Sequence, residues 1–244
     1  MIMGNSRSAS FRRRAIVLTF VTLCASSCFR GVAERMERAR AVERTAGALA
    51  GRIESPLAAS FRAAGAIYPP REVLLLAFKK ERLLELWARD DAGFRRIKSY
   101  PVLGASGGPG PKLREGDRQV PEGVYPITGL NPASAYYLAL ALGYPNDFDR
   151  EMAARDGRSA LGGDIHIHGG DFSTGCLAIG DAAIEELFLL AWRTGTKGMR
   201  VIIAPHTTPA PFVPPPHSPS WTVELYRRIR AEIDTLAAPA RHGR

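Results

Sequence analysis

The sequence predicts a mainly β domain with flanking helices, because short apolar runs separated by turn residues fill the middle of the chain. Residues 72–78 and 83–88 are two apolar runs around a polar turn, and residues 94–102 form a third run after an Asp-Asp-Ala-Gly turn. We expect a hairpin followed by a third strand. Leucine-rich runs also fit helices, so a helix over residues 72–88 is the alternative.

Three further strands are expected where apolar side chains again recur between turn residues. They cover residues 125–130, 136–142 and 199–204. Between the last strand and the carboxyl terminus, residues 205–219 are rich in proline and predict an extended, irregular loop.

Helical patterns lie on both sides of these runs. Residues 32–50 mix alanine with charged residues, and residues 148–155 predict a short helical turn. Residues 181–193 begin with acids and end with arginine, which predicts a helix with Asp181 as its N-cap. A closing helix is expected over residues 221–236.

The first 27 residues have the pattern of a signal peptide. Four arginines lie within the first 14 residues, residues 15–25 are apolar, and no acidic residue precedes Glu34. A membrane-spanning helix needs roughly 20 apolar residues, so an uncleaved anchor is the second choice. Cys28 follows a small-residue cleavage pattern and is compatible with a lipoprotein signal, although Ala25 stands where such signals usually have a larger aliphatic residue.

These patterns predict four parts. Residues 1–27 form the signal peptide, 28–68 a helical spacer, 69–236 the globular domain and 237–244 a loose tail. The formal net charge of +9 falls by four with the leader, to +5. Such a surface suits anionic envelope polymers or lipid headgroups, and simple solubility explains it equally well. The sequence has no zinc or RNA-binding motif and no basic-aromatic interleaving, so we expect no nucleic-acid partner.

The segment 164–176 carries the candidate catalytic groups. Polar and apolar residues alternate up to His168, which predicts a strand with His166 and His168 on one face. Two glycines end this strand, and Gly175 precedes Cys176 in a tight turn. A thiol with an imidazole in reach is the minimum apparatus for acyl transfer. The alternative is a structural cysteine beside two core histidines.

Cysteine usage supports a reactive thiol. The chain has three cysteines, and two of them, Cys24 and Cys28, lie in or beside the leader. Export would leave Cys176 as the single thiol of the globular body, whereas structural cysteines in an oxidising compartment are normally paired. A metal site from Asp164, His166 and His168 has suitable ligand types and is a further alternative. We expect neither a metal nor a cofactor.

Three segments follow one another in order within residues 70–205. They are residues 110–125 (Gly-Pro-Lys-Leu-Arg-Glu-Gly-Asp onward), residues 144–149 (Tyr-Pro-Asn-Asp-Phe-Asp), and Ile-His-Gly at 167–169 with Ser-Thr-Gly-Cys at 173–176. In this order they resemble the YkuD-like L,D-transpeptidase catalytic domain, and in particular its YafK-like branch.

The resemblance implies a β-sandwich or barrel-like domain and a cysteine enzyme that acts on peptidoglycan stem peptides. Cys176 would attack the carbonyl of the L-centre of diaminopimelate, and an amine or water would resolve the thioester. The implied partners are stem peptides and an envelope protein linked to murein, in the periplasm or cell envelope. Membrane contact is expected only through a leader or lipid anchor.

The resemblance also implies residue roles. His168 matches the histidine of the Ile-His-Gly signature and would be the general base and proton donor. His166 is either a second-shell partner or a core histidine. The backbone amides of Gly175 and Cys176 would receive the oxyanion, which is worth about 10²–10³ in rate per donor in other acyl-transfer enzymes. Ser173 and Thr174 would orient this turn.

Two positions depart from the common pattern. Thr174 stands where many members have histidine, and Ala178 where many have arginine or asparagine. The interval from His168 to Cys176 is also short, at eight residues. These features suit the YafK-like branch and leave two reactions open, namely cross-linking and hydrolysis of a diaminopimelate bond to an attached protein. A metal-dependent hydrolase and a peptidoglycan-binding protein without activity are the remaining alternatives.

Overall fold

The computed structural model describes residues 9–207 and 209–236, and for residues 9–30 it describes only the backbone. The chain divides into two units, residues 1–44 and 45–244. The start of the predicted signal peptide and the predicted tail lie outside the described residues, and so do the side chains of Cys24 and Cys28. The predicted four-part division therefore stays a prediction.

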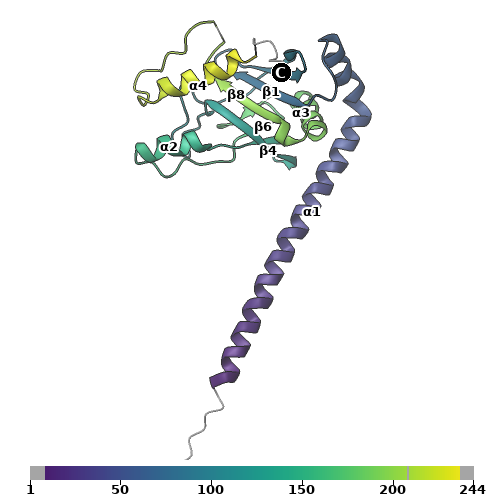
Figure 1. The fold of residues 1–244 in the computed structure, drawn as a ribbon, viewed down its shortest axis with the longest axis vertical. Helices are drawn as coiled ribbons and strands as arrows, with labels where there is room; N and C mark the ends of the chain where they lie inside the picture. The colour runs from purple at the N-terminus through teal and green to yellow at the C-terminus, as the bar shows by residue number, and fades with distance from the viewer. Residues whose placement is uncertain (1–8, 208, 237–244) are drawn as a thin grey trace, which may run out of the picture. The chain divides into compact units, whose positions relative to one another are not determined.

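Helix α1 (Ala9–Ala63) contains the predicted helix 32–50 and continues beyond it (Figure 1). In the first unit its described side chains are mostly exposed, and Glu37 pairs there with Arg44 at 3.1 Å. In the second unit four of its apolar side chains are buried, namely Ala46, Leu49, Leu57 and Phe61. No helix in the part of the chain that the structure describes has a segment both long and apolar enough to cross a membrane.

Eight strands form one sheet in the order β3-β2-β1-β8-β4-β5-β6-β7. Pairs β1–β8 and β6–β7 are parallel, and the other neighbours are antiparallel. The strands are β1 Glu72–Phe78, β2 Leu83–Asp90, β3 Gly93–Pro101, β4 Gly123–Ser134, β5 Tyr137–Leu142, β6 His166–His168, β7 Leu177–Ala178 and β8 Met199–Ala204. The predicted hairpin and third strand are confirmed, and the helical alternative over residues 72–88 is wrong.

The predicted fold class, mainly β with flanking helices, is confirmed. The sheet is flanked by α2 (Asp147–Arg155), α3 (Asp181–Thr194) and α4 (Thr222–Asp234), and the 3₁₀ turn η1 (Thr196–Gly198) precedes β8. Alternate residues of β1 and β8 pack with α2 and α4 in one apolar cluster that includes Leu74, Leu76, Ile202, Met152 and Ile229. Because β1 is buried on both faces, it is a continuous apolar run.

Two of the differences from the predicted boundaries concern the starts of β6 and α3. The strand expected from Asp164 begins only at His166, because Asp164 has a left-handed φ of 54° that interrupts extended backbone. Gly180, and not Asp181, is the N-cap of α3. The Asp181 carboxylate instead accepts a hydrogen bond from the Gly170 amide at 2.8 Å, so it ties the start of α3 to the turn that follows β6.

Candidate active site

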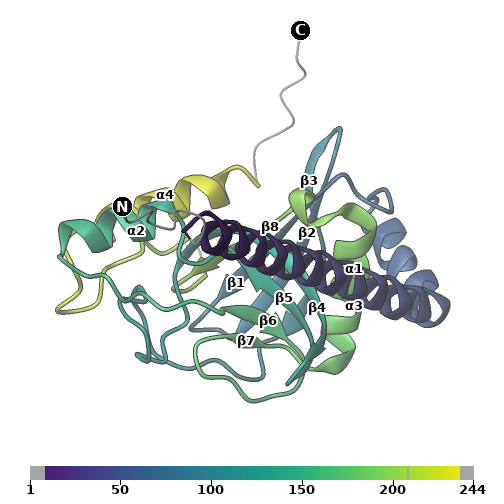
Figure 2. The same cartoon turned by 90° about the horizontal axis from the view of Figure 1, so that it is seen from below.

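Strands β6 and β7 form one edge of the sheet (Figure 2), and this edge carries the two histidines on β6 and Cys176 directly before β7. In this parallel pair, Ile167 lies opposite Leu177 and His168 opposite Ala178. Paired residues of neighbouring strands share a face, so Cys176, one residue before β7, lies beside His166 and diagonal to His168 on the same face. The pairing thus brings together the three side chains that the sequence singles out.

The Cys176 thiol is free and partly buried. Its sulfur accepts the backbone N–H of His166 at 3.3 Å and donates to the carbonyl oxygen of Asp164 at 3.6 Å. Burial raises the pKa of the thiol above its usual value, and the negative charge of Asp164 adds to this. The His166 N–H and the positive charge of Lys112 act in the opposite direction. At neutral pH the thiol is therefore protonated and needs a base.

The surroundings of His168 favour a neutral imidazole that can accept a proton. Its Nδ1 lies 2.7 Å from the carbonyl oxygen of Gly169, which can only accept, so Nδ1 carries the proton and Nε2 keeps its lone pair. Nε2 is buried and has no hydrogen-bond partner among the described residues. Burial lowers the pKa of His168, and the neighbouring His166 lowers it further. The imidazole is therefore neutral and able to take a proton at pH 7.

Tyr136 covers the imidazole of His168, and the sequence did not identify it. The two rings stack with centroids 4.6 Å apart and planes 25° apart. Tyr136 stands in the turn between β4 and β5 and remains partly exposed, whereas His168 is 2% exposed. An exposed aromatic residue in a turn carries no periodic signal, so only the pairing of β5 with β6 reveals its place.

The ring of His166 contacts the backbone just before β6. Its Nδ1 lies 2.8 Å from the carbonyl oxygen of Asp164, the same oxygen that the Cys176 thiol approaches. The contribution of His166 to the thiol comes from its backbone N–H. The ring is partly buried, and the role expected for His166 stays a prediction.

Two serine hydroxyls hold the turn that carries the thiol. Ser173 Oγ accepts the Cys176 amide at 2.9 Å and donates to the Cys176 carbonyl at 2.7 Å. Ser106 Oγ accepts the Gly175 amide at 2.7 Å. Both amides that we expected to receive the oxyanion are therefore already engaged. Thr174 is exposed beside them.

A cavity of about 660 Å³ adjoins the thiol turn. Thr174, Gly175 and Phe172 line one part of it, and Lys112 and Arg118 line another. Acidic side chains at positions 115 and 164 also contribute to the wall. The cavity thus presents two cationic and two acidic side chains beside the turn that carries Cys176.

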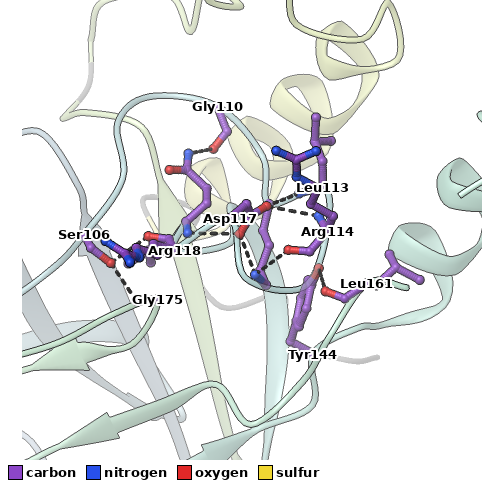
Figure 3. A network of polar contacts seen from close by, with 12 residues as sticks. Ser106, Gly110, Leu113, Arg114, Asp117, Arg118, Tyr144, Leu161 and Gly175 are labelled. Atoms are coloured by element: carbon purple, nitrogen blue, oxygen red, sulfur yellow. Dashed lines mark hydrogen bonds and ion pairs between the residues drawn. The ribbon is translucent and has the colours of Figure 1, made fainter. Parts of the chain in front are cut away.

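The first of the three resembling segments folds around one carboxylate (Figure 3). Asp117 accepts the Lys112 ammonium at 2.6 Å and the amides of Leu113, Arg114 and Gln119 at 2.8, 3.0 and 3.0 Å. Four donors on one side chain define the path of the loop. Asp117 thereby positions Lys112 at the cavity wall.

The second segment supports the scaffold and does not approach the thiol. Asn146 donates to the carbonyl oxygen of Val124 at 3.1 Å, and Tyr144 packs edge-to-face on Tyr125 with centroids 5.8 Å apart. Asn146 and Asp149 form a capping box at the start of α2. Burial raises the pKa of Asp149 to about 6. These residues connect β4 to α2.

The described part of the chain gives no support to the alternative of a metal site. There, no group of three or more histidine, cysteine, aspartate or glutamate side chains is placed to hold an ion. Asp164 contributes its backbone carbonyl to the site, and His168 directs Nδ1 at the Gly169 carbonyl. The two histidines of this alternative thus each place Nδ1 at a backbone carbonyl oxygen, and for His166 that oxygen belongs to Asp164.

Comparison with known proteins follows the resemblance seen in the sequence. No family model matches the chain. The protein named "Putative L,D-transpeptidase YafK" from Escherichia coli, strains K12 and O157:H7, is 37% identical over 118 residues. This match covers 48% of the chain and 46% of each relative, so the chain spans about half the length of the curated relatives it matches.

Solved structures with a similar arrangement are more distant. The helical cell shape determining protein Pgp2 from Campylobacter jejuni is 23% identical with a TM-score of 0.47, over 58% of this chain and 50% of that one. L,D-transpeptidase 1 from Mycobacterium tuberculosis is 13% identical with a TM-score of 0.30, over 54% and 61%. Values this low carry no functional argument. At 37% identity to YafK, the predicted resemblance to the YafK-like branch of the YkuD-like L,D-transpeptidases is confirmed.

Proposed function

We propose that the chain is a cysteine acyl-transferase of the L,D-transpeptidase type, acting on peptidoglycan stem peptides. One observation carries the proposal. The Cys176 thiol, one residue before β7, lies on the same face of the sheet as His168 of β6, whose Nε2 has no hydrogen-bond partner among the described residues. The similarity to YafK supports the substrate class.

The first half-reaction starts from a neutral thiol and a neutral imidazole. As Sγ of Cys176 attacks the carbonyl carbon at the L-centre of diaminopimelate, Nε2 of His168 takes the thiol proton. The carbon–nitrogen bond to the terminal residue then breaks, and His168 returns the proton to the leaving amine. The product is a thioester on Cys176. Nδ1 keeps its hydrogen bond to Gly169 throughout and holds the tautomer.

The second half-reaction resolves the thioester. An amine or water gives a proton to Nε2 of His168 and attacks the carbonyl carbon, and the sulfur leaves and recovers the proton. The reaction is transpeptidation with an amine and hydrolysis with water. The cavity wall carries both cationic side chains (Lys112 and Arg118) and acidic ones (Glu115 and Asp164), which is compatible with a substrate that bears carboxylates and an amine, as stem peptides do.

The oxyanion role is proposed for the Cys176 amide and not for the Gly175 amide. Ser173 belongs to the same short turn as Cys176, so its hydroxyl can turn away and leave the amide to the substrate oxygen. Gly175 is buried, and its amide points to Ser106 of another loop, which revises the expectation from sequence. Thr174 stays proposed as an orienting residue on the cavity wall.

The site is proposed to work outside the cytoplasm. A signal peptide over residues 1–27, a spacer over 28–68 and a catalytic domain over 69–236 remain our proposal for the organisation. The charged, exposed surface of α1 in its first unit and the buried face over residues 46–61 support a spacer that merges into the globular unit. A murein-linked envelope protein is the proposed additional partner.

Hydrolysis of a diaminopimelate bond to an attached protein is the second candidate. Thr174 and Ala178 replace the histidine and the arginine or asparagine found in many members, and Ala178 is buried. Analysis of products from tetrapeptide muropeptides and from protein-linked murein separates the two reactions. Cross-linked products support transpeptidation, and release of the protein supports hydrolysis.

Mass spectrometry of the intact protein after treatment with a carbapenem tests the proposal. We expect one covalent adduct on Cys176 and none in the Cys176→Ala variant. Absence of an adduct on the wild type, with retained muropeptide binding, would indicate a binding protein. Activity that survives Cys176→Ala and is lost with a chelator would indicate a metal-dependent hydrolase.

A further inference from the structure

Ser106 connects the turn that carries the thiol to the wall of the cavity (Figure 3). Its hydroxyl oxygen accepts the Gly175 amide at 2.7 Å, and its proton goes to the carbonyl oxygen of Arg118 at 2.6 Å. Gly175 directly precedes the nucleophile, and Arg118 lines the cavity. One side chain thus bonds to both parts of the site, although it lies 69 residues from Gly175 in the sequence.

The loop that presents Ser106 is anchored next to the catalytic strands. Gly104 forms a bridge with Ala178, with the Ala178 amide 2.9 Å from the Gly104 carbonyl oxygen. A Cβ at Gly104 would lie 2.3 Å from the carbonyl oxygen of Asp171, so only glycine permits this approach. Two residues later, Ser106 also accepts the Val120 amide on its own carbonyl oxygen. Its position is therefore determined from both sides.

The Gly175 amide needs this acceptor. Gly175 is buried and has a φ of 98°, a region that favours glycine, and a glycine peptide can readily adopt other orientations when its amide loses its acceptor. A buried amide without a partner is unfavourable, and the chain would rotate the peptide to recover a bond. Such a rotation would move Cys176 relative to both His168 and the cavity.

We propose that Ser106 is a positioning residue for acyl transfer at Cys176. It fixes the Gly175 peptide, and with it the thiol, at a set distance from the cavity wall formed by Arg118. The inference rests on the proposed function, because it assumes that Cys176 is the nucleophile. Ser106 itself touches neither the thiol nor the substrate carbonyl and takes no proton.

The test compares two reactions of the same thiol in the full chain. Acylation by a carbapenem needs the thiol to be aligned with a bound acyl group, whereas alkylation by iodoacetamide needs an accessible thiolate and no bound acyl group. We expect Ser106→Ala to slow acylation by about ten- to a hundredfold, the range for a lost buried hydrogen bond, and to change alkylation by less than about twofold. Ser106→Thr keeps the hydroxyl and should recover most of the acylation rate.

Ser99→Ala is the matched control, because Ser99 is exposed on β3 at the opposite end of the sheet. Unchanged acylation in Ser106→Ala would overturn the inference while leaving the proposed function intact. Equal slowing of acylation and alkylation, with a lower melting temperature, would also overturn it and indicate a purely structural serine. Wild type that forms no adduct, or Cys176→Ala that still forms one, would overturn the proposed function itself and the inference with it.

Discussion

The centre of the sheet and its catalytic edge are built in different ways. Strand β1 has seven residues, pairs along its length with β2 and β8, and is buried on both faces. At the edge, β6 has three residues and β7 has two. Hydrogen bonds from Ser106, Ser173 and Asp181 hold the backbone around these two strands.

The difference separates stability from catalysis. Burial of apolar surface stabilises the centre, and this contribution does not depend on the exact position of any polar atom. The edge depends on individual hydrogen bonds, each worth about 0.5–1.5 kcal/mol net. Substitutions at the centre should therefore unfold the protein without changing the chemistry, and substitutions at the edge should change the chemistry in a folded protein.

His168→Gln should give the largest effect on the chemistry. Loss of a general base typically lowers the rate by about 10²–10⁴-fold, and glutamine has no basic nitrogen to take the thiol proton. The variant should still fold, because the site lies at the short-stranded edge. Carbapenem acylation and thermal unfolding by circular dichroism measure the two quantities. A rate within tenfold of wild type would show that another group acts as the base.

Leu75→Ala should lower the stability of the protein and leave the chemistry nearly unchanged. Leu75 is fully buried in β1, and truncation of a buried leucine costs about 3–5 kcal/mol in the free energy of unfolding. Urea unfolding measures this loss, and acylation per folded molecule should stay within about twofold. Val223→Ala is the control, since Val223 is 64% exposed and should change stability by less than about 0.5 kcal/mol. A large fall in the acylation rate of folded Leu75→Ala would show that the centre of the sheet also determines the chemistry.

The contrast between the centre of the sheet and its edge also explains which elements the sequence predicts. The central strands are long apolar runs with clear turns between them, so β1, β2, β3 and β8 appear at their predicted places. The helix alternative over residues 72–88 failed because the polar turn at 79–82 divides the run into two strands. A strand that is buried on both faces is a continuous apolar run, and such a run can be recognised in a single sequence.

At the β6–β7 edge, the sequence predicts which residues form the candidate site, but it predicts their contacts less well. The alternation before His168 correctly indicated a strand with two histidines on one face, but the strand begins at His166, after the left-handed Asp164. Asp181 was taken for an N-cap because its local pattern fits one, whereas its carboxylate bonds to Gly170. Ser106 and Tyr136 reach the site through tertiary contacts, which no local pattern encodes.

Glu122→Gln probes a polar element that lies between the two regions. Glu122 forms a buried ion pair with Lys79 at 3.1 Å and accepts the Gly110 amide at 2.9 Å. Lys79 also donates to the carbonyl oxygens of Gly110 and Val120, so the pair joins β1 to the loop that carries Ser106. Removing the negative charge leaves a buried ammonium unpaired, which should cost about 3 kcal/mol.

Chemical unfolding measures that loss, and hydrogen exchange locates it. We expect faster exchange over residues 104–120 and little change in β2 and β3. Exchange that accelerates equally throughout the sheet would mean that the ion pair belongs to the core and not to the loop. Glu115→Gln, on the same loop but exposed, is the matched control and should leave the free energy of unfolding unchanged within about 0.5 kcal/mol.

Tyr136→Ala should give the smallest effect, a shift in pH dependence. Burial lowers the pKa of His168, and the stacked Tyr136 ring contributes to this burial. In the proposed mechanism the neutral imidazole is the active form, so acylation should fall as pH decreases through a midpoint below about 6.5, the ordinary histidine value. Removing the ring lets water reach the imidazole and should raise the midpoint toward 6.5, by less than about one pH unit.

The direction in which the pH midpoint shifts in Tyr136→Ala distinguishes an effect of burial on His168 from an effect of charge. His166 and the Cys176 thiol are the titratable neighbours of His168, and neither changes in Tyr136→Ala. Tyr136→Phe keeps the ring and should keep the wild-type midpoint. The folded protein favours neutral His168, so its contribution to stability is present above about 6.5 and lost as the pH falls below that value. A lower midpoint in Tyr136→Ala would show that the ring stabilises the imidazolium by a cation–π contact.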